Sequence, residues 1–232
     1  MTPLPLYLTT DYPCSYLPKR QARNLVADPQ QINQNQYQSL LLQGFRRSGE
    51  HVYRPHCHHC QACQSLRVHS RNFRPSRAQR RVEQRNRDLQ LHWRPMAQDS
   101  EHFDLFQRYT HYRHPQGGMD AISADDFFAF TTSRWCHSRL WELRDGSNRL
   151  VCGAVIDHLN DGFSAVYSYF EPLASQRSLG TLIILHQLWQ AKRQELPWVY
   201  LGYYIEDCRK MAYKARFKPH QRFIAGQWQK QN

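Results

Sequence analysis

Residues 139–218 carry the pattern that most constrains the fold of this chain. RLWELRD predicts a strand, and RLVCGAVIDHL and FSAVYSYFEP predict two more, joined as a hairpin by Asn160-Asp161-Gly162. SLGTLIILHQLWQAKRQEL then predicts an amphipathic helix, PWVYLGYYI an apolar strand, and CRKMAYKARF a second helix. The buried face of the first helix is expected at Leu179, Leu182, Ile183, His186 and Trp189. This order of elements predicts an α/β unit built on a mixed sheet.

The preceding residues predict a second, smaller unit. A short helix is expected to begin at Asp28-Pro29 and to end at Gly44, and strands are expected in GFRRSGEHVYRPHC, SLRVHSRNF and LHWRP. Because Pro95 ends the last of these strands, we place a domain boundary there. Residues 1–95 are then an N-terminal cysteine-containing, Arg-rich α/β region, and residues 96–232 are the larger domain.

The larger domain is expected to begin with two helices and to end with a strand. The first helix covers about residues 100–111. Ser123 is the expected N-cap of the second, because acidic residues follow it in the first turn. At the end of the chain, HQRFIAGQWQ is expected to form one strand.

The chain is strongly basic, and most of its basic residues are arginine. The formal net charge is +12, and six of the 31 basic residues are Lys. Because the planar guanidinium group matches phosphate, we expect a polyanionic partner, RNA or DNA. One face of a predicted helix is expected to contact phosphates, the alternative being a solvated surface helix. The residues of that face are Arg77, Arg80, Arg81 and Arg85.

Three cysteines lie at strict three-residue spacing in YRPHCHHCQACQSLRV: Cys57, Cys60 and Cys63. A closed zinc site needs four ligands, and Cys14 in DYPCSYLP is the natural fourth, although a histidine of the run could replace it. The spacing also suits an iron–sulfur cluster, and thiols without metal that pack or sense oxidation are the third alternative. The other cysteines are expected to be packed residues: Cys136, Cys152 and Cys208.

The beginning of the chain lacks the basic and apolar regions of a signal peptide. No run of about 18 apolar residues occurs, so we expect no membrane partner. The cysteines are then expected to be free thiols or metal ligands in a reducing cytoplasm rather than disulfides.

Two segments of the larger domain are candidates for the chemistry. Arg177, Ser178 and Gly180 open a helix directly after a strand, where backbone N–H groups favour an anion; a plain helix cap is the alternative. This order resembles the way an N-acetyltransferase-like fold holds a phosphorylated acyl carrier. Because the fuller Gly-rich loop is missing, the carrier is expected not to be coenzyme A. YLGYYIEDCRKMAYKARFK predicts a pocket wall, or else a core strand followed by a basic surface helix.

Together, YRPxCxxCxAC, SAVYSYFEP, RSLGT and YLGYYIEDCRKMAYKARF closely resemble the aminoacyl-tRNA–protein transferases. The nearer likeness is to the short bacterial branch, the aspartate/glutamate leucyltransferases, and it covers nearly the whole chain. The resemblance implies a cytoplasmic enzyme with an acetyltransferase-like catalytic half. It also implies transfer of leucine from leucyl-tRNA to the N-terminal amine of proteins that begin with Asp or Glu, which marks those proteins for degradation.

The resemblance also suggests roles for individual residues. The acidic residues nearest the family motifs are Glu171, Glu206 and Asp207, and one of them could act as a modest base. A cation is expected to bind the acidic side chain of the acceptor. The candidates for catalysis are Glu171, Arg177, Tyr203, Glu206, Lys210 and Tyr213. The candidates for substrate binding are Tyr167, Tyr169, Ser178, Gly180, Arg209, Lys214 and Arg216.

The implied reaction can proceed mainly by positioning the two substrates and stabilising the oxyanion. An aminoacyl ester is already activated, and an α-amine has a reference pKa of about 7.7–8.0, so no strong base and no cofactor is required. Three other functions stay open: arginyl transfer from arginyl-tRNA, a non-enzymatic RNA-binding metal protein, and a small-molecule N-acetyltransferase with a basic arm. The missing Gly-rich loop disfavours the last of these.

Overall fold

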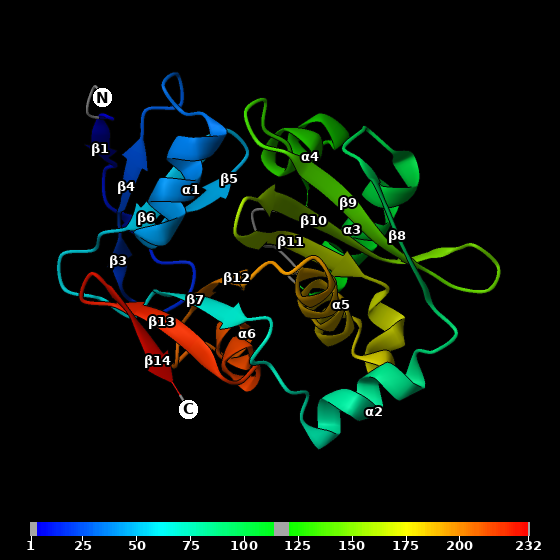
Figure 1. The fold of residues 1–232 in the computed structure, drawn as a ribbon. Coiled ribbons are helices and arrows are strands. Elements are labelled where there is room, and N and C mark those ends of the chain that lie inside the picture. Colours follow the sequence, from blue (N-terminus) through cyan, green and yellow to red (C-terminus); the bar gives the residue numbers. More distant parts are fainter. Residues whose placement is uncertain (1–3, 114–120, 232) are drawn as a thin grey trace.

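The computed structural model describes residues 4–113 and 121–231, and most of its strands belong to one large sheet (Figure 1). The order of this eight-stranded sheet is β14-β13-β7-β12-β11-β10-β9-β8. Its strands are β7 (Gln64–His69), β8 (Gln90–Pro95), β9 (Ser138–Arg144), β10 (Leu150–Leu159), β11 (Gly162–Phe170), β12 (Trp198–Tyr204), β13 (His220–Ile224) and β14 (Gln227–Gln231). Because β11 and β12 run parallel and the other neighbours antiparallel, the sheet is mixed, which confirms the predicted fold class.

A smaller sheet in the N-terminal region has the order β1-β4-β6-β5. Its strands are β1 (Leu6–Leu8), β4 (Asn24–Ala27), β5 (Arg46–Ser48) and β6 (His51–Pro55). A two-stranded ribbon pairs β2 (Tyr12–Pro13) with β3 (Gln21–Ala22), and α1 (Gln34–Leu42) lies beside the small sheet (Figure 1).

The two sheets share buried contacts. Tyr37, Leu41 and Val52 of the N-terminal region pack in one apolar cluster with Leu159 and Tyr200 of the large sheet. In addition, β7 and β8 precede the predicted boundary at residue 95, yet both belong to the large sheet. The division into 1–95 and 96–232 therefore does not coincide with a break between sheets.

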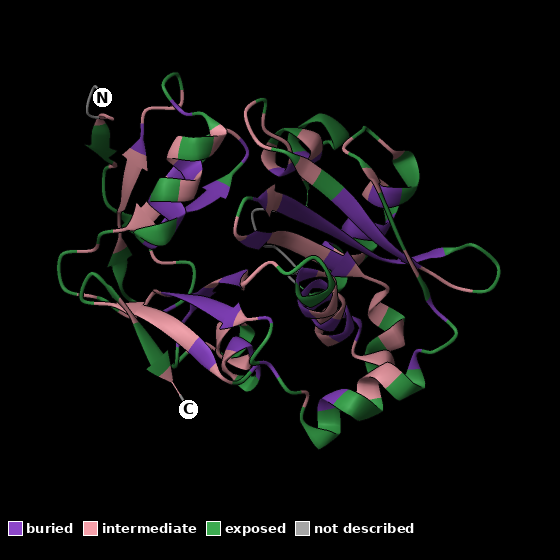
Figure 2. Cartoon of the chain, in the orientation of Figure 1, coloured by how far each residue is buried: buried purple, intermediate pink, exposed green. Residues whose placement is uncertain are grey.

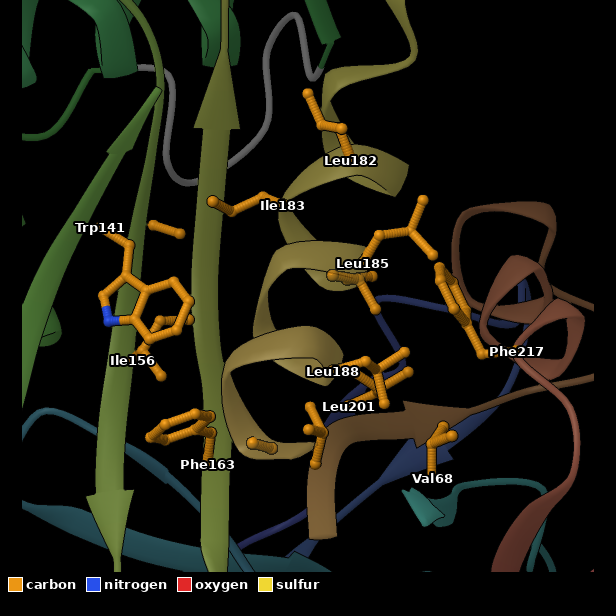
Figure 3. Close-up of a cluster of buried hydrophobic side chains, with 14 of the residues drawn as sticks. Val68, Trp141, Ile156, Phe163, Leu182, Ile183, Leu185, Leu188, Leu201 and Phe217 are labelled. Atoms are coloured by element: carbon orange, nitrogen blue, oxygen red, sulfur yellow. The ribbon is translucent and has the colours of Figure 1, made fainter. Parts of the chain in front are cut away.

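Helices cover both faces of the large sheet. Along β9, Trp141 and Leu143 pack into the cluster formed by α5 (Leu179–Arg193), whereas Glu142 bonds His102 of α3 (Ser100–Arg113). Successive strand residues point to opposite faces, so α5 and α3 lie on opposite sides. Figure 3 shows the apolar face of α5 against Trp141, Ile156 and other sheet residues. The other helices are α2 (Arg77–Arg85), α4 (Ala124–Thr131) and α6 (Arg209–Ala212), with the 3-10 turns η1 (Pro172–Arg177) and η2 (Tyr213–Arg216).

Burial follows this layering. Buried residues concentrate in β9, β10, β12 and α5, while α2 is exposed along most of its length (Figure 2). The predicted hairpin at Asn160-Asp161-Gly162 and the N-cap at Ser123 are confirmed. The predicted helix α5 is present and is buried at Leu179, Leu182 and Ile183, but His186 and Trp189 are only half-buried, because the helix turns Leu185 and Leu188 toward the sheet instead. None of the described helices is long and apolar enough to cross a membrane.

Three elements differ from the sequence prediction. The helix expected from Asp28-Pro29 begins at Gln34, because Asn33 and Gln36 form a capping box. The expected end strand is the hairpin β13–β14, because Ala225 and Gly226 both adopt positive φ in its tight turn. The basic helix after β12 is short, since α6 passes directly into the 3-10 turn η2.

Candidate functional site

The two parallel strands separate soon after they begin. β11 pairs with β12 only from Gly162 to Ser164, and beyond this the two described strands have no ladder between them. We call the unpaired ends, residues 165–170 of β11 and 201–204 of β12, the fork. The segment after β11 leads into α5, and the segment after β12 leads into α6 and η2. The carboxyl ends of parallel strands are the usual place for ligands in such sheets.

Two buried cations meet at the fork. Arg46 of β5 donates from Nη2 to the carbonyl oxygen of Ala165 in β11 (2.6 Å), and Lys214 of η2 donates from Nζ to the carbonyl oxygen of Tyr203 in β12 (2.7 Å). Arg46 is 6% exposed and Lys214 is 8% exposed. A Cβ atom at Gly202 would lie 3.7 Å from Arg46 Nε, Arg46 Nη2 and Lys214 Nζ. The two side chains therefore face the same small space beside the backbone of β12.

The electrostatics of this pair are unusual. Burial, together with the neighbouring Arg46 charge, lowers the pKa of Lys214 to about 7, although the Cys208 and Cys63 thiols act in the opposite direction. Neither cation forms an ion pair with a carboxylate among the described residues, and Arg46 Nη1 is buried without a hydrogen-bond partner. Sequence reasoning had included Lys214 but missed Arg46. The only sequence signal for Arg46 is a pair of arginines in a strand, in GFRRSG.

Tyrosines surround the fork on both sides. The hydroxyl of Tyr203 donates to the carbonyl oxygens of Gly44 (3.3 Å) and Tyr53 (3.1 Å), so it joins β12 to the N-terminal region. Burial and then the Tyr109 phenol raise the pKa of both Tyr167 and Tyr213, the latter to about 12. The predicted residues Tyr167 and Tyr213 thus lie around one neighbour, Tyr109 of α3.

The fourth predicted tyrosine, Tyr169, is fully buried rather than exposed in a pocket. Its hydroxyl lies 2.6 Å from Nδ1 of His102, whose Nε2 is 2.8 Å from Glu142. Arg94 and Arg144 both donate to the Glu142 carboxylate (2.5 and 2.8 Å). The Tyr169 hydroxyl therefore belongs to a buried polar network with His102 and Glu142, and the substrate-binding role predicted for Tyr169 stays a prediction.

The residues that open α5 have structural partners. Arg177 donates from Nε to Asn86 (2.8 Å) and forms an ion pair with Asp88, both at the end of α2. Ser178 adopts a left-handed conformation (φ 54°) without a side-chain cap. A Cβ at Gly180 would lie 3.0 Å from the Phe170 ring, so close packing accounts for this glycine. The roles predicted for these three residues stay predictions.

The remaining candidates lie on the segments that follow β11 and β12. Glu171 accepts from Arg108 (3.5 Å) and caps η1 through the Leu173 N–H (3.5 Å). The exposed candidates on the segment after β12 are Glu206, Asp207, Arg209, Lys210 and Arg216. Their predicted roles stay predictions.

The predicted phosphate-binding residues Arg77, Arg80, Arg81 and Arg85 are all exposed on α2. At one end of this helix Gln79 donates to the carbonyl oxygen of Arg216 in η2 (3.3 Å), and at the other Arg85 donates to the carbonyl oxygen of Gln176 in η1. α2 therefore runs from the segment after β12 to the segment that opens α5. The basic helix lies along the rim of the candidate site.

The four predicted metal ligands gather around one cavity of about 1200 Å³, which Tyr53 and Tyr203 also line. Burial and then the Cys57, Cys14, Cys60 and Cys208 thiols raise the pKa of Cys63 to about 12. The N–H of Leu17 donates to Cys14 Sγ (3.4 Å). Yet among the described residues no three His, Cys, Asp or Glu side chains stand in a metal-ligating arrangement. The thiols are neighbours, but as they stand they do not form a closed site.

Two protein-family models match most of the chain. The model named "Arginine-tRNA-protein transferase, C terminus" matches residues 101–224, and the model of the N terminus matches residues 12–81. An aspartate/glutamate leucyltransferase of Nitrosococcus oceani is 49% identical over 96% of this chain and 94% of that protein. One from Teredinibacter turnerae is 44% identical over 97% of this chain and 93% of that protein. Among solved structures, L-PGS from Bacillus licheniformis aligns at a TM-score of 0.48 and 13% identity, over 63% of this chain and 46% of that chain.

Proposed function

Because this chain belongs to the arginine-tRNA-protein transferase family, we propose that it transfers leucine from leucyl-tRNA to the N-terminal α-amine of proteins that begin with Asp or Glu. The observation that carries this proposal is the likeness to aspartate/glutamate leucyltransferases, at 49% and 44% identity over nearly the whole chain. The modified proteins would be marked for degradation. We place the reaction in the cytoplasm, where charged tRNA and new protein N-termini meet.

The reaction is a simple acyl transfer. The lone pair of the α-amine attacks the ester carbonyl carbon, which forms the C–N bond and a tetrahedral oxyanion. When the oxyanion collapses, the C–O bond to the terminal ribose breaks, and the ribose oxygen takes up the proton that the amine loses. The products are a protein longer by one amide-linked leucine and a free tRNA. Holding the amine and the ester together and stabilising the oxyanion can supply most of the rate.

The fork between β11 and β12 is the place we propose for this chemistry. It lies at the carboxyl ends of the two parallel strands, between the segments that open α5 and η2. The exposed arginines of α2 lie along its rim, and their unneutralised charge suits the phosphates of a tRNA acceptor stem. An aminoacyl end held from α2 would then reach the fork while the tRNA body stays outside.

A metal at the cysteine set is a separate proposal. Cys14, Cys57, Cys60 and Cys63 could hold zinc or an iron–sulfur cluster if the thiols, now neighbours around one cavity, drew together. The transfer reaction proposed above does not use such a group. Metal analysis and the visible absorption spectrum of the purified protein, with Cys60→Ser as the comparison, would distinguish zinc, an iron–sulfur cluster and free thiols.

The transfer proposal is tested by supplying labelled leucyl-tRNA or arginyl-tRNA with peptides that begin with Asp, Glu or Ala. We expect leucine on the Asp and Glu peptides only. Transfer of arginine instead would show that the donor is arginyl-tRNA, while the proposed acyl-transfer reaction would be retained. No transfer from either tRNA would reject the enzyme and favour an RNA-binding protein without this activity.

A further inference from the structure

Two buried cations at the fork lack a counter-charge. Arg46 and Lys214 are each more than nine-tenths buried, and no carboxylate of the described residues pairs with either. A buried charge is costly unless an opposite charge or a full set of hydrogen bonds compensates it. Two like charges beside Gly202 raise that cost further. Such an arrangement is expected where a ligand brings the missing negative charge.

The hydrogen bonds of the two side chains show what that ligand must offer. Arg46 donates from Nη2 to Ala165, but its Nη1, which carries two N–H groups, has no hydrogen-bond partner in residues 4–113 and 121–231. Lys214 uses one N–H for the Tyr203 carbonyl and a second for the weak acceptor Met211 Sδ, which leaves one donor. A group with two anionic oxygens could therefore accept from both side chains at once.

Gly202 is the residue of β12 that lies against both cations. The nearest heavy atoms to a Cβ built at this position are the nitrogens of Arg46 and Lys214, all at 3.7 Å. These distances are ordinary van der Waals contacts, so one carbon atom fits at this position and the cationic donors of both side chains bound it. Residue 202 has φ +82°, which favours glycine, so no side chain fills this space.

The burial of the site selects among the anions that the reaction involves. A tRNA phosphate lies between two riboses and suits the exposed arginines of α2 rather than two side chains that are 6% and 8% exposed. An oxyanion exists only during the reaction, so it cannot compensate the pair in the resting complex. The side chain at the first residue of an acceptor protein is small, carries a full charge and can enter a narrow space end-on.

We propose that Arg46 and Lys214 together bind the side-chain carboxylate of the acceptor's N-terminal Asp or Glu. This assignment rests on the transfer function proposed above and names the residues that give it its specificity. It places the acceptor's first residue in the fork, with its α-amine directed toward the incoming ester.

The test compares peptides that begin with Asp and with its uncharged isostere Asn, using wild-type protein, Arg46→Gln and Lys214→Gln. In either variant we expect kcat/KM for the Asp peptide to fall roughly 10- to 100-fold, with little change for the Asn peptide, so that the Asp-to-Asn ratio collapses. Arg193→Gln, an exposed position at the end of α5, is the matched control and should keep the ratio. Thermal unfolding of each variant shows whether it is folded.

Binding without tRNA separates this assignment from the transfer function. By fluorescence anisotropy, the Asp peptide should bind the wild-type protein and bind Arg46→Gln roughly 10-fold more weakly or worse. If binding depends on Arg46 but the wild-type protein transfers no leucine, the carboxylate site stands and the reaction fails. If leucine is transferred while folded Arg46→Gln keeps the wild-type Asp-to-Asn ratio, the reaction stands and the assignment is overturned. If the variants keep the wild-type Asp-to-Asn ratio but bind tRNA more weakly, Arg46 and Lys214 bind a tRNA phosphate. That outcome would also overturn the carboxylate assignment.

Discussion

Arg46 and Arg47 follow one another on β5, and both side chains are buried, but their guanidinium groups have different neighbours. Arg47 donates to both oxygens of Asp157 (2.8 and 2.5 Å) and to the carbonyl oxygen of Thr131 (3.1 Å). Tyr37 donates to the same carboxylate (2.9 Å). Within the described part of the chain, the Arg46 guanidinium has one hydrogen-bond partner, the carbonyl oxygen of Ala165, and it lies beside Lys214.

The comparison separates two uses of a buried charge. The Arg47–Asp157 pair joins the N-terminal region to β10, and its hydrogen bonds are satisfied within the protein. Removing either partner would leave the other charge buried and alone. Among the residues that the structure describes, no carboxylate compensates Arg46, so its removal should relieve an unfavourable interaction. A structural charge and a ligand-binding charge can thus be distinguished by the change in the free energy of unfolding when each is removed.

The largest effect is expected from breaking the satisfied pair. Asp157→Asn keeps the shape of the side chain but leaves the Arg47 charge without a counter-charge, so we expect a loss of about 3–5 kcal/mol in the free energy of unfolding. Urea denaturation measures this loss. Asp104→Asn, an exposed carboxylate on α3, is the control and should leave the midpoint unchanged. A similarly small change in Asp157→Asn would mean that the pair does not hold the two regions together.

The second effect concerns Lys214 and pH. Its pKa in the folded protein is about 7, below the ordinary lysine value of 10.5, because of burial and of Arg46. The unfolded chain then binds more protons between these two values, so the contribution of Lys214 to stability is unfavourable at pH 6 and improves as pH rises toward 10.

We therefore expect Lys214→Met to be more stable than the wild-type protein at pH 6, by on the order of 3 kcal/mol, and the difference to shrink by pH 10. Urea denaturation at several pH values measures the difference in the free energy of unfolding between the two proteins. Distant titrating groups are the same in both proteins, so their contributions cancel in this difference. The groups that face Lys214 are Arg46, Cys63 and Cys208. A difference that is constant with pH would show that Lys214 stays charged in the folded state.

A smaller effect, on tRNA binding, is expected from the substitution of an exposed arginine. Arg81→Gln on α2 should weaken tRNA binding and reduce the slope of log affinity against log salt by about 1, because one phosphate contact is lost. Its stability should stay unchanged, since the side chain is exposed. Filter binding at several salt concentrations measures the slope. An unchanged slope would exclude Arg81 from the tRNA surface.

The smallest effect completes the comparison. Arg46→Leu should change the free energy of unfolding by less than about 1 kcal/mol, or raise it, because an uncompensated charge and one hydrogen bond to a carbonyl are lost together. Urea denaturation of Arg46→Leu and Asp157→Asn under the same conditions compares the two changes in the free energy of unfolding. A loss as large as that of Asp157→Asn would give Arg46 a structural role of the same kind as Arg47.

Local pattern was enough for most of the elements. The hairpin at Asn160-Asp161-Gly162 and the cap at Ser123 depend on neighbours in sequence, and both were predicted correctly. The buried face of α5 was predicted only in part, since His186 and Trp189 are half-buried. The start of α1 was misplaced, because Asp28-Pro29 and Asn33 are both plausible helix starts and the capping box with Gln36 decided between them.

The site divides in the same way. Motifs in the chain identified the family. They also predicted functional residues in the segments after β11 and β12, including Lys214. The motifs also predicted Tyr169 and Arg177 as site residues. Their partners, His102 and Asp88, lie in distant segments of the chain, so the spacing of residues in the sequence could not predict these contacts. Arg46 was missed, because a strand arginine in sequence carries no sign of whether an acid will lie beside it.

The sequence by itself thus determined the family, the mixed α/β class and the basic character of the surface, since these follow from composition, periodicity and motif. Only the tertiary structure decided which of two adjacent arginines is compensated. Arg47 meets Asp157 more than a hundred residues away, while Arg46 meets Lys214 instead. The free energy of a buried charge is set by what surrounds it in space, and neighbours in the chain do not report that.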